Sequence, residues 1–212
     1  MDQRVGRPKG YDRDTALLAA RDLFWEQGYE RTSIADLETR TGLNRSSIYQ
    51  EFGSKRELFE AALECYADRV IADLLAGLRS GGLRSGPGPE AGLDSVSALF
   101  RRLGELFRCD TAVSARGCMM VNAIAELAAR DDRVRAAAAA YRDRLRASFG
   151  SALAAAAAKG EIDPSTADAR AHLLASALMG VWLSVRIDPA DASRLCTTVA
   201  HQVESWRGPE PA

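Results

Sequence analysis

Residues Ser33 to Phe52 read S-I-A-D-L-E-T-R-T-G-L-N-R-S-S-I-Y-Q-E-F, and this stretch decides the fold. It predicts two short helices joined by a tight turn. Ser33 can cap the first helix with its hydroxyl, Gly42 favours a sharp helix stop, and Asn44 can cap the second helix. Ile48 and Phe52 fall four residues apart in the second helix and point inward. The layout is typical of a helix-turn-helix, whose second helix lies in the major groove of DNA.

The sequence on either side supports this interpretation, which a glycine-separated helix pair alone would leave open. An upstream helix with one apolar side stops at Gly28, and Tyr29 follows it as a hydrophobic plug. Downstream, Ser54 stands three residues before Glu57, which is the spacing of a capping box. Three short helices and the start of a fourth therefore occupy residues 12–66.

With these helices in place, the chain resembles the tetracycline-repressor (TetR) family of bacterial transcription regulators. The resemblance implies an all-helical dimer with a small DNA-binding head and a larger C-terminal domain that binds a ligand and the second subunit. It covers roughly the first third of the chain with many spaced positions. These are Leu17, Ala19, Ala20, Leu23, Phe24, Glu26, Gly28, Tyr29, Thr32, Ser33, Ile34, Leu37, Gly42, Ile48, Tyr49, Phe52, Ser54, Lys55 and Leu58.

The chain departs from the family at four positions of the helix-turn-helix. Glu38 and Thr41 stand where alanine is usual, and Gln50 and Glu51 stand where His and an aromatic residue are common. These departures bear on which bases are read rather than on the fold.

Composition agrees with a helical DNA-binding protein. Hydrophobic residues make up 47% of the 212 residues, mostly Ala and Leu, which favours helix over strand. No apolar run reaches the length of a membrane span and no signal peptide opens the chain, so we expect a cytoplasmic protein. The four cysteines lack paired spacing, which predicts neither a disulfide nor a metal site, and no cofactor is indicated. The net charge is −1, so the basic groups that contact DNA must be local.

The exposed side of the second helix predicts how DNA is held. We expect Arg45, Ser46 and Gln50 to face base edges, while Tyr49 and Ser47 contact phosphates. Further phosphate contacts come from Thr32 or Ser33 and from Lys55 at two helix N-termini, and a flexible basic arm resembles a minor-groove arm. The predicted DNA-binding residues are Arg4, Arg7, Lys9, Thr32, Ser33, Asn44, Arg45, Ser46, Ser47, Tyr49, Gln50 and Lys55.

The whole chain divides into an arm at 1–11, a head at 12–53, a helical body at 54–207 and a tail at 208–212, with about nine helices in all. In the body we expect helices over 54–79, 93–108, 116–128 and 131–159, another from Pro164 and a last one after Pro189. The segment 80–92 is rich in Gly, Pro and Ser and predicts a loop.

The body is expected to hold an unidentified small-molecule effector and the surface for a homodimer. An apolar, aromatic cavity with a few polar groups is predicted from Phe100, Leu103, Phe107, Cys118, Asn122, Glu126, Tyr141, Leu145, Phe149 and Trp182. The dimer interface is predicted on the last two helices at Leu174, Leu178, Val181, Leu195, Val199 and Val203. A repressor that an effector releases from its operator is therefore the expected function.

Cys118 leaves an alternative open. It follows Gly117 and lies in the first turn of its predicted helix, where the helix dipole favours a thiolate, so it is either a sensor of electrophiles and oxidants or a small core residue. R-G-C-x-x-x-N-x-x-x-E, from Arg116 to Glu126, also looks like a subgroup of the family, some of whose members answer to such compounds. A helical enzyme or a scaffold that has lost DNA binding are further alternatives. No catalytic constellation has recognisable spacing, and the retained Tyr49 and Lys55 argue against a scaffold.

Overall fold

The computed structural model describes residues 12–80, 91–109 and 111–208. The predicted basic arm with Arg4, Arg7 and Lys9, most of the predicted loop and the end of the tail lie outside these ranges. Within them, the regular elements are ten α-helices and one short 3₁₀ helix, so the predicted all-α fold is confirmed. The residues form two compact units, one up to Cys65 and one from Tyr66 onward.

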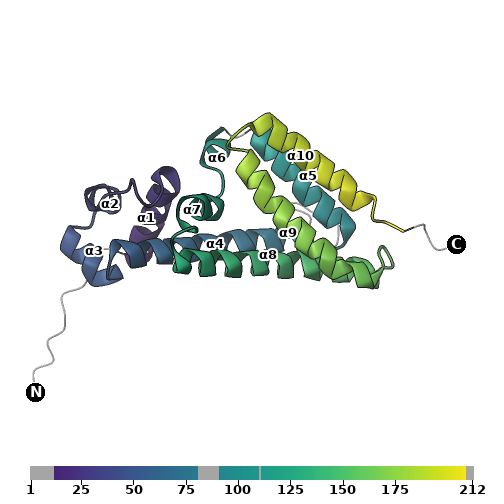
Figure 1. The fold of residues 1–212 in the computed structure, drawn as a ribbon, viewed down its shortest axis with the longest axis horizontal. Helices are drawn as coiled ribbons and strands as arrows, with labels where there is room; N and C mark the ends of the chain where they lie inside the picture. The colour runs from purple at the N-terminus through teal and green to yellow at the C-terminus, as the bar shows by residue number, and fades with distance from the viewer. Residues whose placement is uncertain (1–11, 81–90, 110, 209–212) are drawn as a thin grey trace, which may run out of the picture. The chain divides into compact units, whose positions relative to one another are not determined.

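The first unit contains α1 (Arg13–Gln27), α2 (Ile34–Thr41), α3 (Arg45–Phe52) and the beginning of α4 (Lys55–Ser80) (Figure 1). Side-chain caps set the helix starts. The Asp12 carboxylate accepts the N–H groups of Asp14 and Thr15. Ser33 accepts the N–H of Asp36 at 3.1 Å, and the Ser54 hydroxyl accepts the N–H of Glu57 at 3.1 Å. The predicted caps at Ser33 and Ser54 are therefore confirmed.

The core of the first unit explains why α4 contributes to it. The Phe59 ring of α4 meets the Phe24 ring edge-on, with centroids 5.1 Å apart, and lies 4.9 Å from the Tyr29 ring. Leu37 of α2 and Ile48 of α3 are fully buried. The first turns of α4 therefore pack with the head, whereas the predicted domain boundary fell just before this helix.

The second unit contains the rest of α4 followed by α5 (Leu93–Cys109), α6 (Thr111–Arg116), α7 (Met119–Leu127), α8 (Asp132–Ala158), η1 (Pro164–Thr166), α9 (Ala167–Ser184) and α10 (Pro189–Glu204). Helices α5 and α10 lie side by side, as do α8 and α9 (Figure 1). Gly104 permits the close approach of α5 and α10, since a Cβ there would lie 3.2 Å from both Cys196 Cβ and the Ser193 carbonyl oxygen.

The predicted helix over 116–128 corresponds to α7, and its first residue, Arg116, is the end of a separate helix, α6, that was not predicted. Gly117 has φ +64°, a left-handed conformation that interrupts the helix, and Cys118 is extended. Helix α6 therefore ends at Arg116, and α7 starts at Met119 with Cys118 as its N-cap. The sequence pattern identified the glycine but placed it inside the entry of one helix.

Candidate DNA-binding and effector sites

The start of α3 is held by Asn44. Its side-chain oxygen accepts the N–H of Ser47 at 2.9 Å and the hydroxyl of Ser46 at 2.8 Å. The predicted cap is confirmed, and it occupies both the Asn44 oxygen and the Ser46 hydroxyl proton. A base contact by Ser46 would therefore use the remaining acceptor capacity of its oxygen.

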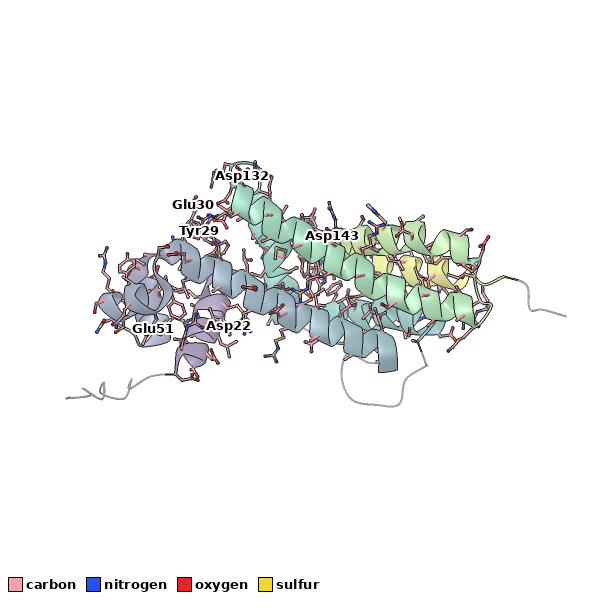
Figure 2. All side chains as sticks on the ribbon, turned by 90° about the horizontal axis from the view of Figure 1, so that it is seen from below. Asp22, Tyr29, Glu30, Glu51, Asp132 and Asp143 are labelled. Atoms are coloured by element: carbon pink, nitrogen blue, oxygen red, sulfur yellow. The ribbon has the colours of Figure 1, made fainter. Side chains whose placement is uncertain are left out.

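Helix α3 has two distinct faces. Ile48 and Phe52 are buried, whereas Arg45, Tyr49 and Gln50 are exposed. The Arg45 guanidinium lies over the Tyr49 ring, 5.6 Å from its centroid, which holds two of the predicted DNA-contacting groups together. Asn44 and Ser46 are also exposed, and Ser47 and Glu51, the latter labelled in Figure 2, are half-buried. The structure thus places the predicted reading face on one side of a short capped helix.

Thr32 requires a correction. Its side chain is fully buried, and its hydroxyl donates to the carbonyl oxygen of Gly28 at 2.6 Å. A hydroxyl four residues after that carbonyl satisfies the end of α1 and is not available to a phosphate. The predicted DNA contact by the Thr32 side chain is therefore wrong, and Thr32 is a structural residue of the head.

Ser33 and Lys55 lie at the surface near helix starts, as expected, but both have partners. Ser33 is exposed, and its hydroxyl donates to the Asp36 carboxylate at 2.7 Å. This bond, with a second from the Ser33 N–H, lowers the pKa of Asp36. Lys55 Nζ lies over the Tyr29 ring, 4.3 Å from its centroid. DNA contacts by Ser33 and Lys55 remain predictions.

Glu38 makes a contact across the turn that the sequence did not predict. Its side-chain oxygen accepts the N–H of Arg45, the first residue of α3, at 2.6 Å. The sequence offered one signal, since Glu38 was recognised as a departure from the usual alanine. Glu38 and Arg45 are seven residues apart with a turn between them, so the sequence did not identify Arg45 as the partner of Glu38.

In the body, the predicted effector residues form two aromatic pairs. The rings of Phe100 and Phe149 stack with centroids 6.1 Å apart, and Phe107 meets Trp182 edge-on at 5.0 Å. Seven of the predicted residues are buried and contribute to the core of this unit: Phe100, Leu103, Phe107, Cys118, Tyr141, Leu145 and Phe149. Asn122, Glu126 and Trp182 are half-buried.

Cys118 lies in a buried polar cluster with two tyrosines. Hydroxyls of Tyr66 and Tyr141 hydrogen-bond with its thiol, and the first amides of α7 are close to the sulfur. Burial raises the pKa of Cys118, and this effect outweighs the groups that would lower it. The predicted lowering of the Cys118 pKa by the helix start is therefore wrong. Tyr66, which the sequence did not single out, belongs to the cluster because α4 carries it into this unit.

Asn122 joins three parts of the body. Its amide nitrogen donates to the carbonyl oxygen of Arg116 at 2.9 Å, and its side-chain oxygen accepts from the Arg186 guanidinium at 2.9 Å. Asn122 thus connects the end of α6, helix α7 and the segment after α9. Ligand contact by Asn122 stays a prediction.

Two hollows occur on the described surface of the body. A groove of about 440 Å³ is lined by Phe107, Arg108, Ser114, Ala115, Val185, Arg186, Pro189 and Ala190, and shares Phe107 with the predicted effector site. A smaller one of about 280 Å³ lies between α8 and α9, beside Asp143, which Figure 2 labels. An ion pair between Arg146 and Asp168, 2.6 Å long, lines the smaller hollow.

Comparison with known proteins supplies the family. The model for bacterial regulatory proteins of the tetR family matches residues 16–62. The model for the tetracyclin repressor-like C-terminal domain matches residues 92–199, which is half of the chain. This chain belongs to the TetR family.

Relatives of this TetR-family protein include regulators with assigned names. The HTH-type transcriptional repressor ComR of Escherichia coli is 52% identical over 67 residues, which are 32% of this chain and 32% of ComR. The chain thus matches about a third of the length of this curated relative.

Solved structures match over nearly the whole chain. A TetR regulator from Chloroflexus aurantiacus has 25% identity and a TM-score of 0.73, with 92% of each chain covered. A CifR cysteine mutant complexed with 26 bp operator DNA has 30% identity and a TM-score of 0.65, covering 96% of this chain and 100% of CifR.

The predicted dimer surface of this TetR-family chain also needs correction. Leu174, Leu178 and Val181 of α9 and Val203 of α10 are buried within a single chain, and Leu195 and Val199 are half-buried. An apolar stripe at helical spacing predicts that a helix face is buried. It does not show whether the core of the same subunit or a partner subunit covers that face. The four buried side chains face the core of their own subunit.

A neighbouring stripe of the TetR-family body is open instead. Leu173 and Leu183 of α9 are 54% and 51% exposed, and Ile187 just beyond the helix is 81% exposed. Exposed Ser176 and Gly180 lie between them, and a Cβ at Gly180 would have no atom within 4 Å. None of these residues belongs to the interface that the sequence predicted.

Two further features of the described residues concern membrane-spanning helices and metal-ligating clusters. None of their helices is long and apolar enough to cross a membrane. No group of three His, Cys, Asp or Glu side chains in the same ranges has the geometry to hold a metal ion.

Proposed function

We propose that this TetR-family protein is a transcriptional repressor that binds operator DNA as a homodimer and leaves it when a small-molecule effector binds. The observation that carries the proposal is α3, a capped helix with a buried apolar side and exposed Arg45, Tyr49 and Gln50 on the other. The repressor name of ComR and the operator complex of CifR support the same reading. The protein would act by binding rather than by catalysis.

A gel-shift assay tests DNA binding directly. The DNA is the promoter region next to the protein's own gene, and the control is a fragment of equal length from inside a coding sequence. We expect a retarded band with the promoter at protein concentrations that leave the control fragment free. Equal retardation of both fragments, or of neither, would contradict the proposal for this operator.

The homodimer is proposed to form through the open stripe of α9. Leu173 and Leu183 provide apolar area, and Ser176 and Gly180 between them let the two-fold related helix approach closely. A dimer is required because one head offers too few contacts for useful specificity. Half-sites must then lie a whole number of DNA turns apart.

Sedimentation of a charged variant tests this surface. Leu183→Asp should dissociate the dimer, because it buries two carboxylates at a two-fold contact. The matched control is Ala154→Asp, which places the same charge at an exposed position of α8. A Leu183→Asp protein that sediments as the wild type does would show that the dimer uses another surface.

The effector is proposed to bind in the body near the Cys118–Tyr66–Tyr141 cluster and the Phe107–Trp182 pair. This region combines aromatic surface with a few hydrogen-bonding groups, which is the usual composition of a small-molecule site. The effector would act through α4, a single helix whose residues belong to both units. To release DNA, the effector needs to bind the state that does not bind DNA more tightly than the DNA-binding state, by about 1–3 kcal/mol.

Trp182 gives a readout of this coupling. The chain has three tryptophans, so the double variant Trp25→Phe, Trp206→Phe retains Trp182 alone. Mass spectrometry of small molecules that copurify with the protein supplies candidate effectors. A candidate should change Trp182 fluorescence and release operator DNA over the same concentration range. An effector that binds without changing DNA affinity would refute the coupling while leaving the site intact.

A further inference from the structure

Glu38 bonds on both sides of the turn between α2 and α3. Its backbone carbonyl accepts the N–H of Gly42 at 3.0 Å, which closes the last turn of α2. Its side-chain Oε1 accepts the N–H of Arg45 at 2.6 Å, which is the first N–H of α3. One residue therefore fixes the end of one helix and the beginning of the next.

The bond to Arg45 has the features of a strong hydrogen bond. The first N–H groups of a helix have no partner within the helix, so an external acceptor stabilises them. A carboxylate acceptor adds its charge at the positive end of the helix dipole. Helix α3 has no acidic residue in its own first turn, so Glu38 supplies from α2 the charge that such a residue would provide.

The other bonds of the turn stay on one side of it. Asn44 and Ser47 bond within the start of α3, and the Thr41 hydroxyl bonds to Leu37 of α2 and accepts the N–H of Leu43 in the turn. The Glu38–Arg45 bond instead joins the body of α2 to α3. It therefore links the two helices directly, in addition to the packing of buried Leu37 and Ile48.

We propose that Glu38 is a positioning residue for DNA recognition, which holds α3 against α2 so that Arg45 and Gln50 meet the correct base edges. The inference rests on the proposed DNA-binding function. Helix α3 has only eight residues, so a loose first turn would displace Arg45 itself. Base contacts depend on position to within hydrogen-bond reach and carry the sequence information, whereas phosphate contacts are made alike to every sequence.

The charge of Glu38 has a second effect that is separable from the hydrogen bond. A carboxylate beside the reading helix repels the phosphates of every DNA sequence alike. The hydrogen bond therefore increases the preference for one sequence, and the charge weakens binding to all sequences. Variants that remove one without the other distinguish these two effects.

Two charge-matched pairs of full-length protein make that separation. Glu38→Gln keeps an acceptor oxygen and loses the charge, whereas Glu38→Ala loses both. Glu38→Asp keeps the charge but is one methylene too short for the 2.6 Å contact in the wild type. Two DNA duplexes serve as probes, one selected from a random pool by the wild-type protein and one with the same bases in shuffled order.

The ratio of affinities for the selected and shuffled duplexes is the measured quantity. The net contribution of one hydrogen bond, about 1 kcal/mol, corresponds to about fivefold in affinity. The ratio should therefore be about fivefold lower in Glu38→Ala than in Glu38→Gln for each head, or about 25-fold lower for a dimer with two heads. The ratio for Glu38→Asp should likewise be lower than the ratio for the wild type. Glu38→Gln should bind the shuffled duplex more tightly than the wild type, with a steeper salt dependence.

Other outcomes separate the two hypotheses. If the wild-type protein selects no preferred duplex, the proposed DNA-binding function fails. If the wild type discriminates but both charge-matched pairs have equal ratios, Glu38 is not a positioning residue. Hydrogen exchange of the Arg45 amide should be faster in Glu38→Ala than in Glu38→Gln, and equal rates would also overturn the role. If Glu38→Ala does not fold, the comparison of wild type with Glu38→Asp decides.

Discussion

Thiol reactivity offers a direct test of how the body is packed around Cys118. Alkylation of the native protein with N-ethylmaleimide should modify exposed Cys109 first and half-buried Cys65 next. Cys118 and Cys196 are buried, with 1% and 0% of their surface exposed, and should react only when the fold opens. If Cys118 were a sensing thiol, it would instead be alkylated before the other cysteines.

The structure gives a magnitude for one of the buried thiols. Burial raises the pKa of Cys196 from 9.0 to about 12. Since the thiolate is the nucleophile, its fraction at pH 8 falls from about one in ten to about one in ten thousand. The shift alone therefore slows Cys196 about a thousandfold relative to a thiol of ordinary pKa. Burial raises the pKa of Cys118 as well, so slow reaction is expected there for the same reason.

The assay is a time course of labelling at pH 8, followed by peptide mapping, with gel-shift measurements on the same samples. Protein unfolded in urea is the control, in which the four thiols should react at similar rates. Native Cys118 reacting as fast as Cys109, with loss of DNA binding that Cys118→Ser prevents, would refute the reasoning. It would also establish the thiol-sensor alternative, which burial now disfavours.

Three further predictions concern the core and the head. Cys196 ionises on unfolding once the pH exceeds its unfolded pKa, so raising the pH from 7 to 10 should lower the free energy of unfolding by about 1.4 kcal/mol. This decrease, measured by urea unfolding, should be absent in Cys196→Ala. Thr32→Val should destabilise the head by about 1–3 kcal/mol, and Thr32→Ser should destabilise it by less. Neither variant should change the salt dependence of DNA binding, and a shallower salt dependence would restore Thr32 as a phosphate contact. Tyr49→Phe should weaken all DNA sites alike, whereas Gln50→Ala should cost about 1–3 kcal/mol at one base pair; no effect of either would remove α3 from the interface.

The head could be predicted from sequence because its signals are local. Ser33, Asn44 and Ser54 cap helices through bonds that span three residues, and Ile48 and Phe52 mark the buried side of α3 by their spacing. Thr32 failed for a related reason, since a threonine before a helix can bond backward to the preceding helix as well as forward to a phosphate. Sequence alone does not choose between these two partners.

The body was less predictable because its decisive contacts are distant in sequence. Leu174 and Leu173 are neighbours on α9, yet one faces the core and the other the solvent. Only the packing of α8 and α10 against α9 decides which stripe is covered. At Cys118 the helix start favours a thiolate and burial opposes it, and Tyr66 and Tyr141, which hydrogen-bond with the thiol, come from other helices.

The bonding within the head restricts where DNA specificity can reside. Thr32 is buried, the Ser33 and Ser46 hydroxyls donate to Asp36 and Asn44, and the Asn44 oxygen is used in the cap. Those bonds help to maintain the helix-turn-helix, so we expect the loss of these groups to weaken binding at least partly through the fold. Arg45 and Gln50 remain as exposed side chains with the reach and donors for base edges. In the proposed function Arg45 and Gln50 read the bases, and the proposed role of the Glu38–Arg45 bond is to hold α3 where these two side chains meet them.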